Sequence, residues 1–115
     1  MQERLIDLGR LTGIFRGDRQ RMMAWIGIYL VEVPPLLASM AEHVEAGDDT
    51  ALARAAHELK PQFHYLDAPA MQERVTALQE MTARHGAAAC AALVVEIRGF
   101  GERIEQELRD HLQHA

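Results

Sequence analysis

Residues 52–66 read LARAAHELKPQFHYL, and this stretch decides the fold. Its apolar positions follow a 4-3-4-3 spacing, at Leu52, Ala56, Leu59, Phe63 and Leu66. At about 100° per residue, all five fall within roughly 40° of one line along a helix. Such a stripe is typical of a helix that buries one face in a core. We therefore expect a helix here that has one apolar side and one polar side.

The polar side of this helix carries the residues that can do chemistry. His57 lies about 140° from the apolar stripe, His64 about 120°, Ala53 about 100° and Lys60 about 80°. Arg54 lies on the other flank of His57, three residues before it. We expect an exposed histidine that has a lysine one turn further on, small Ala53 beside it and a second cation within reach.

Helical periodicity continues outward in both directions, and no strand pattern persists. Asp18 is a plausible N-cap, Gly47-Asp48-Asp49 a stop followed by a new cap, and Pro69 a first helical residue. We expect helices at roughly 3–11, 19–46, 49–66, 70–85 and 87–112. Pro34 and Pro35 interrupt the second helix without changing the phase of its stripe, so we expect a kink. The expected core positions in the other helices are Leu5, Leu8, Leu11, Ile26, Leu30, Val33, Leu37, Met40, Val44, Met71, Val75, Leu78, Met81, Leu93, Ile97, Phe100, Ile104 and Leu108.

These elements predict an all-α fold, an up-and-down antiparallel four-helix bundle with a short extra N-terminal helix. A chain of 115 residues, 49% of them hydrophobic, suits one domain over residues 1–115. A net charge of −5 disfavours nucleic-acid binding. One cysteine, Cys90, cannot form a disulfide within the chain, and we interpret it as a helix-packing residue. The start carries no signal-peptide pattern, and the apolar stretch from Trp25 to Val33 is too short to span a bilayer. We expect a cytoplasmic monomer that binds no membrane.

At the run Ala56-His57-Glu58-Leu59-Lys60 the sequence resembles the histidine-containing phosphotransfer (HPt) domains of bacterial multistep phosphorelays. The resemblance extends upstream to Gly17-Asp18, Pro35-Leu36-Leu37 and Ala46-Gly47-Asp48, and more weakly to the last helix. Two positions depart from the family pattern. Pro61 stands where glycine is commoner, and Asp67 replaces a glycine at the helix end, where it can also cap the next helix.

The resemblance implies that His57 accepts a phosphoryl group from a receiver-domain aspartate and passes it to another receiver domain. An imidazole in water has a reference pKa of about 6.5 and keeps a free lone pair at neutral pH. Lys60 would offset part of the phosphate charge, and Ala53, Arg54, Pro61 and His64 would form the receiver docking face. The partners implied are response-regulator receiver domains and hybrid sensor histidine kinases.

The chain has no P-loop and no Gly-rich kinase loop, so we expect a phosphocarrier rather than an enzyme, with no cofactor and no metal of its own. In the family, the receiver supplies the metal and the acceptor aspartate. Two alternatives remain open. One is an HPt-like module that docks a receiver or kinase without carrying phosphate. The other is a small metal- or ligand-binding bundle, although His57 and His64 lie two turns, roughly 10 Å, apart.

Overall fold

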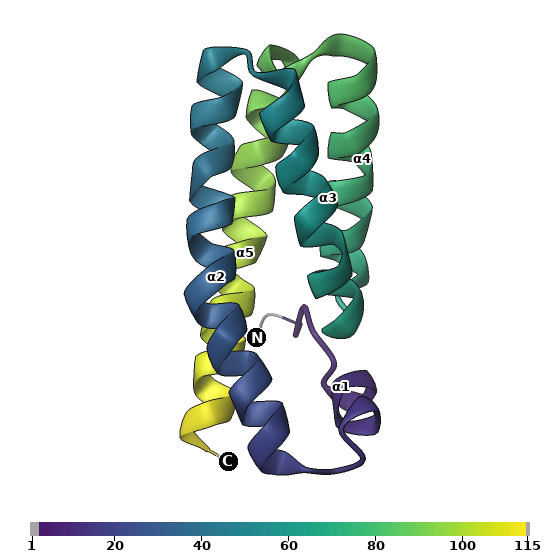
Figure 1. The fold of residues 1–115 in the computed structure, drawn as a ribbon, viewed down its shortest axis with the longest axis vertical. Coiled ribbons are helices and arrows are strands. Elements are labelled where there is room, and N and C mark those ends of the chain that lie inside the picture. The colour runs from purple at the N-terminus through teal and green to yellow at the C-terminus, as the bar shows by residue number, and fades with distance from the viewer. Residues whose placement is uncertain (1–2, 115) are drawn as a thin grey trace.

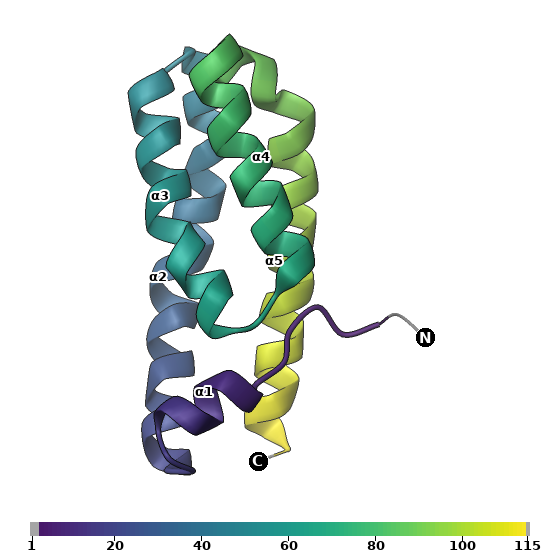
Figure 2. The same ribbon diagram turned by 90° about the vertical axis from the view of Figure 1, so that its right-hand side faces the viewer.

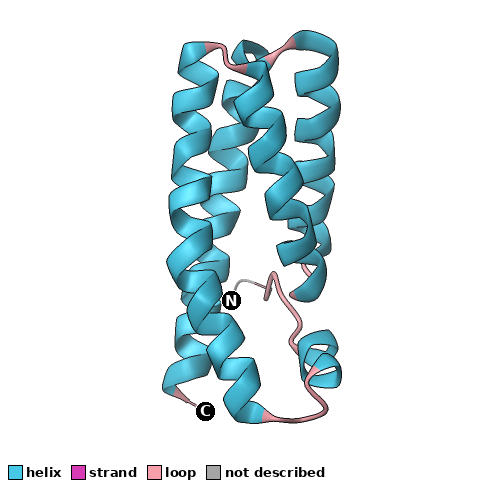
Figure 3. Cartoon of the chain, viewed as in Figure 1, coloured by secondary structure: helices cyan, strands magenta, loops and turns pink. Residues whose placement is uncertain are grey.

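The computed structural model describes residues 3–114, and these form helices joined by short turns (Figures 1 and 3). In chain order, the elements are α1 (Gly9–Ile14), α2 (Arg19–Ala46), α3 (Asp49–Tyr65), α4 (Pro69–His85), the short 3₁₀ helix η1 (Ala87–Cys90) and α5 (Ala91–Gln113). The four long helices, α2 to α5, lie side by side along the long axis of the molecule (Figures 1 and 2). Short α1 packs at one end, near the start of α2.

The helix boundaries are fixed where the sequence predicts caps. The Asp18 side chain accepts a hydrogen bond from the backbone N–H of Arg21 at 3.1 Å, and Asp48 accepts one from Ala51 at 3.0 Å. Gly47 ends α2 in the left-handed conformation, with φ at 64°, which glycine adopts without steric penalty. Gly47 and Asp48 together form the short turn between α2 and α3, and this turn sets the direction in which α3 begins.

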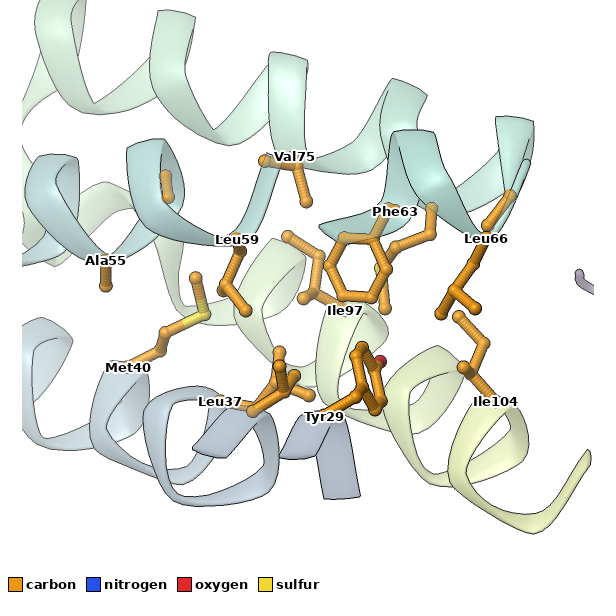
Figure 4. Close-up of a cluster of buried hydrophobic side chains, with 14 of the residues drawn as sticks. Tyr29, Leu37, Met40, Ala55, Leu59, Phe63, Leu66, Val75, Ile97 and Ile104 are labelled. Atoms are coloured by element: carbon orange, nitrogen blue, oxygen red, sulfur yellow. The ribbon is translucent and has the colours of Figure 1, made fainter. Parts of the chain in front are cut away.

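The stripe of α3 forms the centre of the core. Leu52, Ala56, Leu59, Phe63 and Leu66 are all fully buried, as predicted. Figure 4 shows Leu59, Phe63 and Leu66 among other core side chains. The other long helices bury the following expected positions: Ile26, Val33, Leu37, Met40, Met71, Val75, Leu78, Ile97, Ile104 and Leu108. Seven more expected positions are only partly buried at the edge of this core: Leu5, Leu8, Leu30, Val44, Met81, Leu93 and Phe100. Periodicity thus locates the core face of each helix but not the depth of its flanking residues.

The N-terminal segment differs from the expected helix at residues 3–11. Helix α1 begins only at Gly9, whose N–H donates to the Asp7 side chain at 2.8 Å. Residues before it run across the end of the bundle, where the Leu5 N–H donates to Glu107 at 2.9 Å and the Asp7 N–H to the Leu66 carbonyl at 2.9 Å. These long-range bonds replace the helical ones, and no local sequence pattern announces them.

The last helix also starts differently from the prediction. Residues 87–90 form η1, and α5 proper begins at Ala91. The Asp49 carboxylate, at the start of α3, accepts a hydrogen bond from the Ala87 N–H at 2.6 Å and thereby holds this turn. Cys90 is buried within η1, consistent with its predicted packing role.

Three proline and turn positions complete the comparison. Helix α2 continues through Pro34 and Pro35, as the unbroken phase predicts. Asp67 does adopt the positive φ, 48°, expected of a residue in the glycine position. However, it does not cap α4: Ala68 is the N-cap, without a side-chain bond, and Asp67 instead lies 3.7 Å from Arg10. The Asp67 carboxylate forms an ion pair with Arg10 of α1 and does not bond the backbone of α4.

By length and composition alone, α2 could cross a membrane. The sequence-based expectation considered only Trp25 to Val33, whereas the continuous helix is 28 residues long. One such helix is weak evidence, since a helix that packs one face into a core passes the same test. One stripe of α2 does pack in this way, with six buried residues that include Ile26, Val33 and Met40.

Candidate functional site

His57 projects from the middle of α3 into solvent. Ala55 and Ala56, just before it, are buried, and so is Leu59, two residues after it. The core contacts of these three residues hold the backbone of the His57 turn in place. Among residues 3–114, no hydrogen bond or ion pair involves the His57 ring. An accessible imidazole on a fixed helical turn is free to meet a group on another molecule.

Lys60 is exposed one turn after His57, as predicted, and it has a partner that periodicity does not reveal. Its Nζ donates a hydrogen bond to Oε1 of Gln79 on α4 at 3.3 Å. Gln79 is half-buried, so it is a firmer anchor than a freely solvated residue. The contact directs the ammonium group towards α4. Helix α4 lies beside α3 in Figure 2. No sequence signal identifies Gln79, because it is 19 residues away on another helix.

Pro61 changes the backbone beneath His57. Proline has no N–H, so the His57 carbonyl lacks its usual helical donor. Helix α3 nevertheless continues to Tyr65, and Pro61 itself is exposed. The chain therefore stays helical through the His57 turn, although Pro61 cannot donate the usual hydrogen bond to the His57 carbonyl.

An aromatic series holds the C-terminal half of α3 against α2. Tyr65 meets Trp25 edge-on, with ring centroids 6.1 Å apart, and Trp25 stacks on Tyr29 at 5.9 Å. Tyr29 in turn lies edge-on to Phe63 at 6.4 Å. Tyr65 thus packs against another helix, and His64 lies beside it with ring centroids 5.9 Å apart.

The remaining predicted docking residues, Ala53, Arg54 and His64, are exposed on α3 around His57. Ala53 and His64 lie on the same side as Lys60, whereas Arg54 lies on the flank nearer α2, the side on which Tyr65 meets Trp25. Within residues 3–114, no three His, Cys, Asp or Glu side chains come together as metal ligands. The site is therefore an exposed, mainly polar helix surface that carries two imidazoles, His57 and His64.

A cavity of about 170 Å³ lies elsewhere, between α2 and α5, and Tyr29, Leu37, Gly101 and Glu105 are among the residues that line it. The Tyr29 hydroxyl is buried, and no partner for it is found in the described part of the chain. Burial, and secondarily the Glu105 carboxylate, raises the pKa of Tyr29. Because this hydroxyl is buried in the core, we expect it to affect the stability of the fold and not the chemistry of the His57 surface.

A comparison with known protein families identifies the family of the chain. The family model described as Hpt domain matches residues 24–115. The chain belongs to the HPt domain family. The match includes the last helix, where the sequence resemblance is weak. Neither the curated proteins nor the solved structures give a match.

Membership of the HPt family brings its general properties. HPt domains are phosphotransfer modules of phosphorelays, generally non-catalytic, and they interact with response-regulator receiver domains and kinases. The all-helical structure is consistent with the family's four-helix bundle. In this HPt domain the run that carries the resemblance, Ala56 to Lys60, lies within α3, where His57, Glu58 and Lys60 are exposed and Ala56 and Leu59 are buried.

Proposed function

We propose that this HPt domain is a phosphorelay intermediate that carries a phosphoryl group on His57 between receiver domains. The observation that carries the proposal is the geometry of one helical turn. The His57 imidazole is exposed on a helix whose opposite face is buried in the core. One turn away, the Lys60 Nζ donates a hydrogen bond to Oε1 of Gln79 on α4 at 3.3 Å.

The transfer step is a displacement at phosphorus. The lone pair of a neutral His57 ring nitrogen attacks the phosphorus of an aspartyl phosphate on a receiver. A nitrogen–phosphorus bond forms, the bond from phosphorus to the carboxyl oxygen breaks, and its electron pair leaves with the aspartate. The other ring nitrogen keeps its proton. The reverse step on a second receiver regenerates neutral His57.

Lys60 stabilises the charge of the phosphoryl group in this proposal. A charge-assisted hydrogen bond contributes about 1.5–3 kcal/mol. Gln79 is a positioning residue, because it limits the rotamers of the lysine before phosphate arrives. Family receivers supply the metal and the aspartate, so this chain needs neither an ATP site nor a metal of its own.

The docking face consists of Ala53, Arg54, Pro61 and His64. Small Ala53 leaves room beside His57, and Arg54 supplies a second cation on the other flank. Pro61 frees the His57 carbonyl as an acceptor. A receiver that reaches His57 must cover these residues.

We further infer one domain over residues 1–115, an up-and-down order of α2 to α5, and a cytoplasmic location. The bonds from Leu5 to Glu107 and from Asp7 to Leu66 support the first. The short turns at Gly47 and at Asp67-Ala68 favour the second. The third rests on the family's typical solubility and on one buried, unpaired cysteine.

The test uses two receivers, one phosphorylated and one not. The wild-type domain should move label from the first to the second, with an acid-labile, base-stable phosphate on the domain in between. His57→Gln should abolish both the movement of label between the receivers and the phosphate on the domain. His64→Gln, the matched control on the same face, should abolish neither. If the wild-type domain binds both receivers without ever taking label, it is the docking module that does not carry phosphate.

A further inference from the structure

Helix α2 carries a second apolar stripe on the side opposite to the core. The outer stripe contains Ala24, Ile28, Val31, Pro35 and Ala38, again at 4-3-4-3 spacing. All five are exposed, Ile28 by 58% and Val31 by 73%. At about 100° per residue they lie within roughly 40° of the direction opposite to the buried stripe. These two stripes together explain why α2 is apolar enough to resemble a membrane span.

Opposite charges terminate the outer stripe. Glu42 follows Ala38 by four residues and lies on the same line, whereas Arg21 precedes Ala24 by three residues and lies about 60° to one side of it. Within its own chain, Arg21 is 3.9 Å from the Asp18 carboxylate. The Arg21 and Glu42 side chains are both exposed. The outer stripe therefore has five apolar residues, with a cation near its start and an anion at its end.

We propose that the outer stripe is the contact surface between two copies of this chain, which pair α2 against α2 in antiparallel orientation around a two-fold axis near Val31. Residues whose numbers sum to 62 or 63 then face each other. The facing pairs are Val31 with Val31, Ile28 with Pro35, Ala24 with Ala38, and Arg21 with Glu42. Such an isologous contact uses one patch twice and closes at the dimer.

Charge complementarity favours a second copy over other occupants. Antiparallel pairing forms the Arg21–Glu42 pair twice, once at each end, and it also sets the two helix dipoles in opposite directions. An anionic membrane surface would attract Arg21 but repel Glu42. Glu32 approaches its own copy near the axis, but it lies about 80° off the stripe, where both carboxylates reach solvent.

The contact leaves the phosphotransfer surface open. His57 shares the side of α3 that adjoins α4, where Lys60 reaches Gln79, whereas the outer stripe faces away from the core on α2. The proposal does not rest on the function of His57. Each dimer would present two independent carrier sites.

The size of the stripe sets the expected affinity. From Arg21 to Glu42 the helix is about 32 Å long. One helix face of small side chains buries less than the roughly 800 Å² per partner of a standard interface. We therefore expect a weak dimer that forms at high concentration, in place of the monomer expected from the sequence.

Cysteine cross-linking tests the two-fold axis directly. Val31→Cys should give a covalent dimer with a short bifunctional thiol reagent, because the two thiols meet at the axis. Val95→Cys is the matched control, a valine exposed by 69% on α5. Native Cys90 is buried and gives the wild-type background.

A charge swap tests the antiparallel register. Arg21→Glu and Glu42→Arg should each weaken self-association by several-fold in sedimentation equilibrium. The double variant should restore it, because both end pairs are rebuilt with reversed polarity. Circular dichroism confirms that each variant keeps its helices.

Several results would overturn the proposal. One is a monomer at every concentration up to near-millimolar; another is Val31→Cys cross-linking no faster than Val95→Cys. Loss of phosphotransfer or of anionic-vesicle binding in Val31→Glu, with the wild type monomeric throughout, would assign the stripe to a receiver or to a membrane instead.

Discussion

Replacing Lys60 by alanine isolates the electrostatic part of the His57 site. The lysine is exposed and makes one hydrogen bond, 3.3 Å long, to Gln79. Its contact with a phosphoryl group is worth about 1.5–3 kcal/mol, and exposure to solvent favours the lower end of that range. At 1.36 kcal/mol per factor of ten, Lys60→Ala should slow transfer from a phosphorylated receiver about tenfold.

The contribution of Gln79 follows from the same geometry. Gln79→Ala removes an exposed hydrogen bond of about 0.5–1 kcal/mol and should slow transfer about two- to fivefold. Because Gln79 acts through Lys60, the double variant should be no slower than Lys60→Ala alone, a non-additivity that a double-mutant cycle detects. Lys60→Arg, which keeps the charge, should retain most of the activity.

Single-turnover transfer rates and the half-life of the phosphorylated domain provide the assay. Arg19→Ala controls for the loss of one positive charge, since Arg19 is exposed at the start of α2. If Lys60→Ala matched the wild type in both rate and half-life, Lys60 would be a solvated lysine, and the charge-stabilisation argument would fail.

Three further predictions concern the docking face and the core. Ala53→Glu should block transfer without loss of helicity, because Ala53 lies beside His57 and off the core stripe, while Ala53→Ser should remain active; equal activity of both would contradict the docking face. His64→Ala should weaken receiver binding only a few-fold in calorimetry, and a complete loss would give His64 a larger role. Tyr29→Phe removes a buried hydroxyl without a partner in the described chain, so unfolding in urea at neutral pH should show equal or slightly higher stability. Because burial raises the pKa of Tyr29, its ionisation leaves the free energy of unfolding unchanged below pH ~10 and lowers it as the pH rises further, so Tyr29→Phe should reduce that alkaline loss of stability, whereas Tyr65→Phe should not.

Periodicity predicts the α3 side of the site correctly because it is a local property of one helix. The buried stripe from Leu52 to Leu66 and the exposure of His57 and Lys60 both follow from 100° per residue. The caps at Asp18 and Asp48 are equally local, since each side chain bonds a backbone group three residues away.

The features that the sequence does not reveal depend on contacts between distant residues. Gln79 reaches Lys60 across 19 residues, and Asp49 holds the Ala87 turn across 38. The segment before α1 leaves helical form because Leu5 and Asp7 bond to Glu107 and Leu66. No pattern within a single helix encodes such pairings.

Mapping of the phosphorylated residue tests the central claim most directly. The domain would be labelled by a phosphorylated receiver, kept at alkaline pH to preserve phosphohistidine, and analysed by peptide mass spectrometry. We predict one phosphate per chain, on His57, and none on His57→Gln. Phosphate on His64 or on any other residue, or a His57→Gln variant that still takes label, would contradict the assignment of His57 as the carrier.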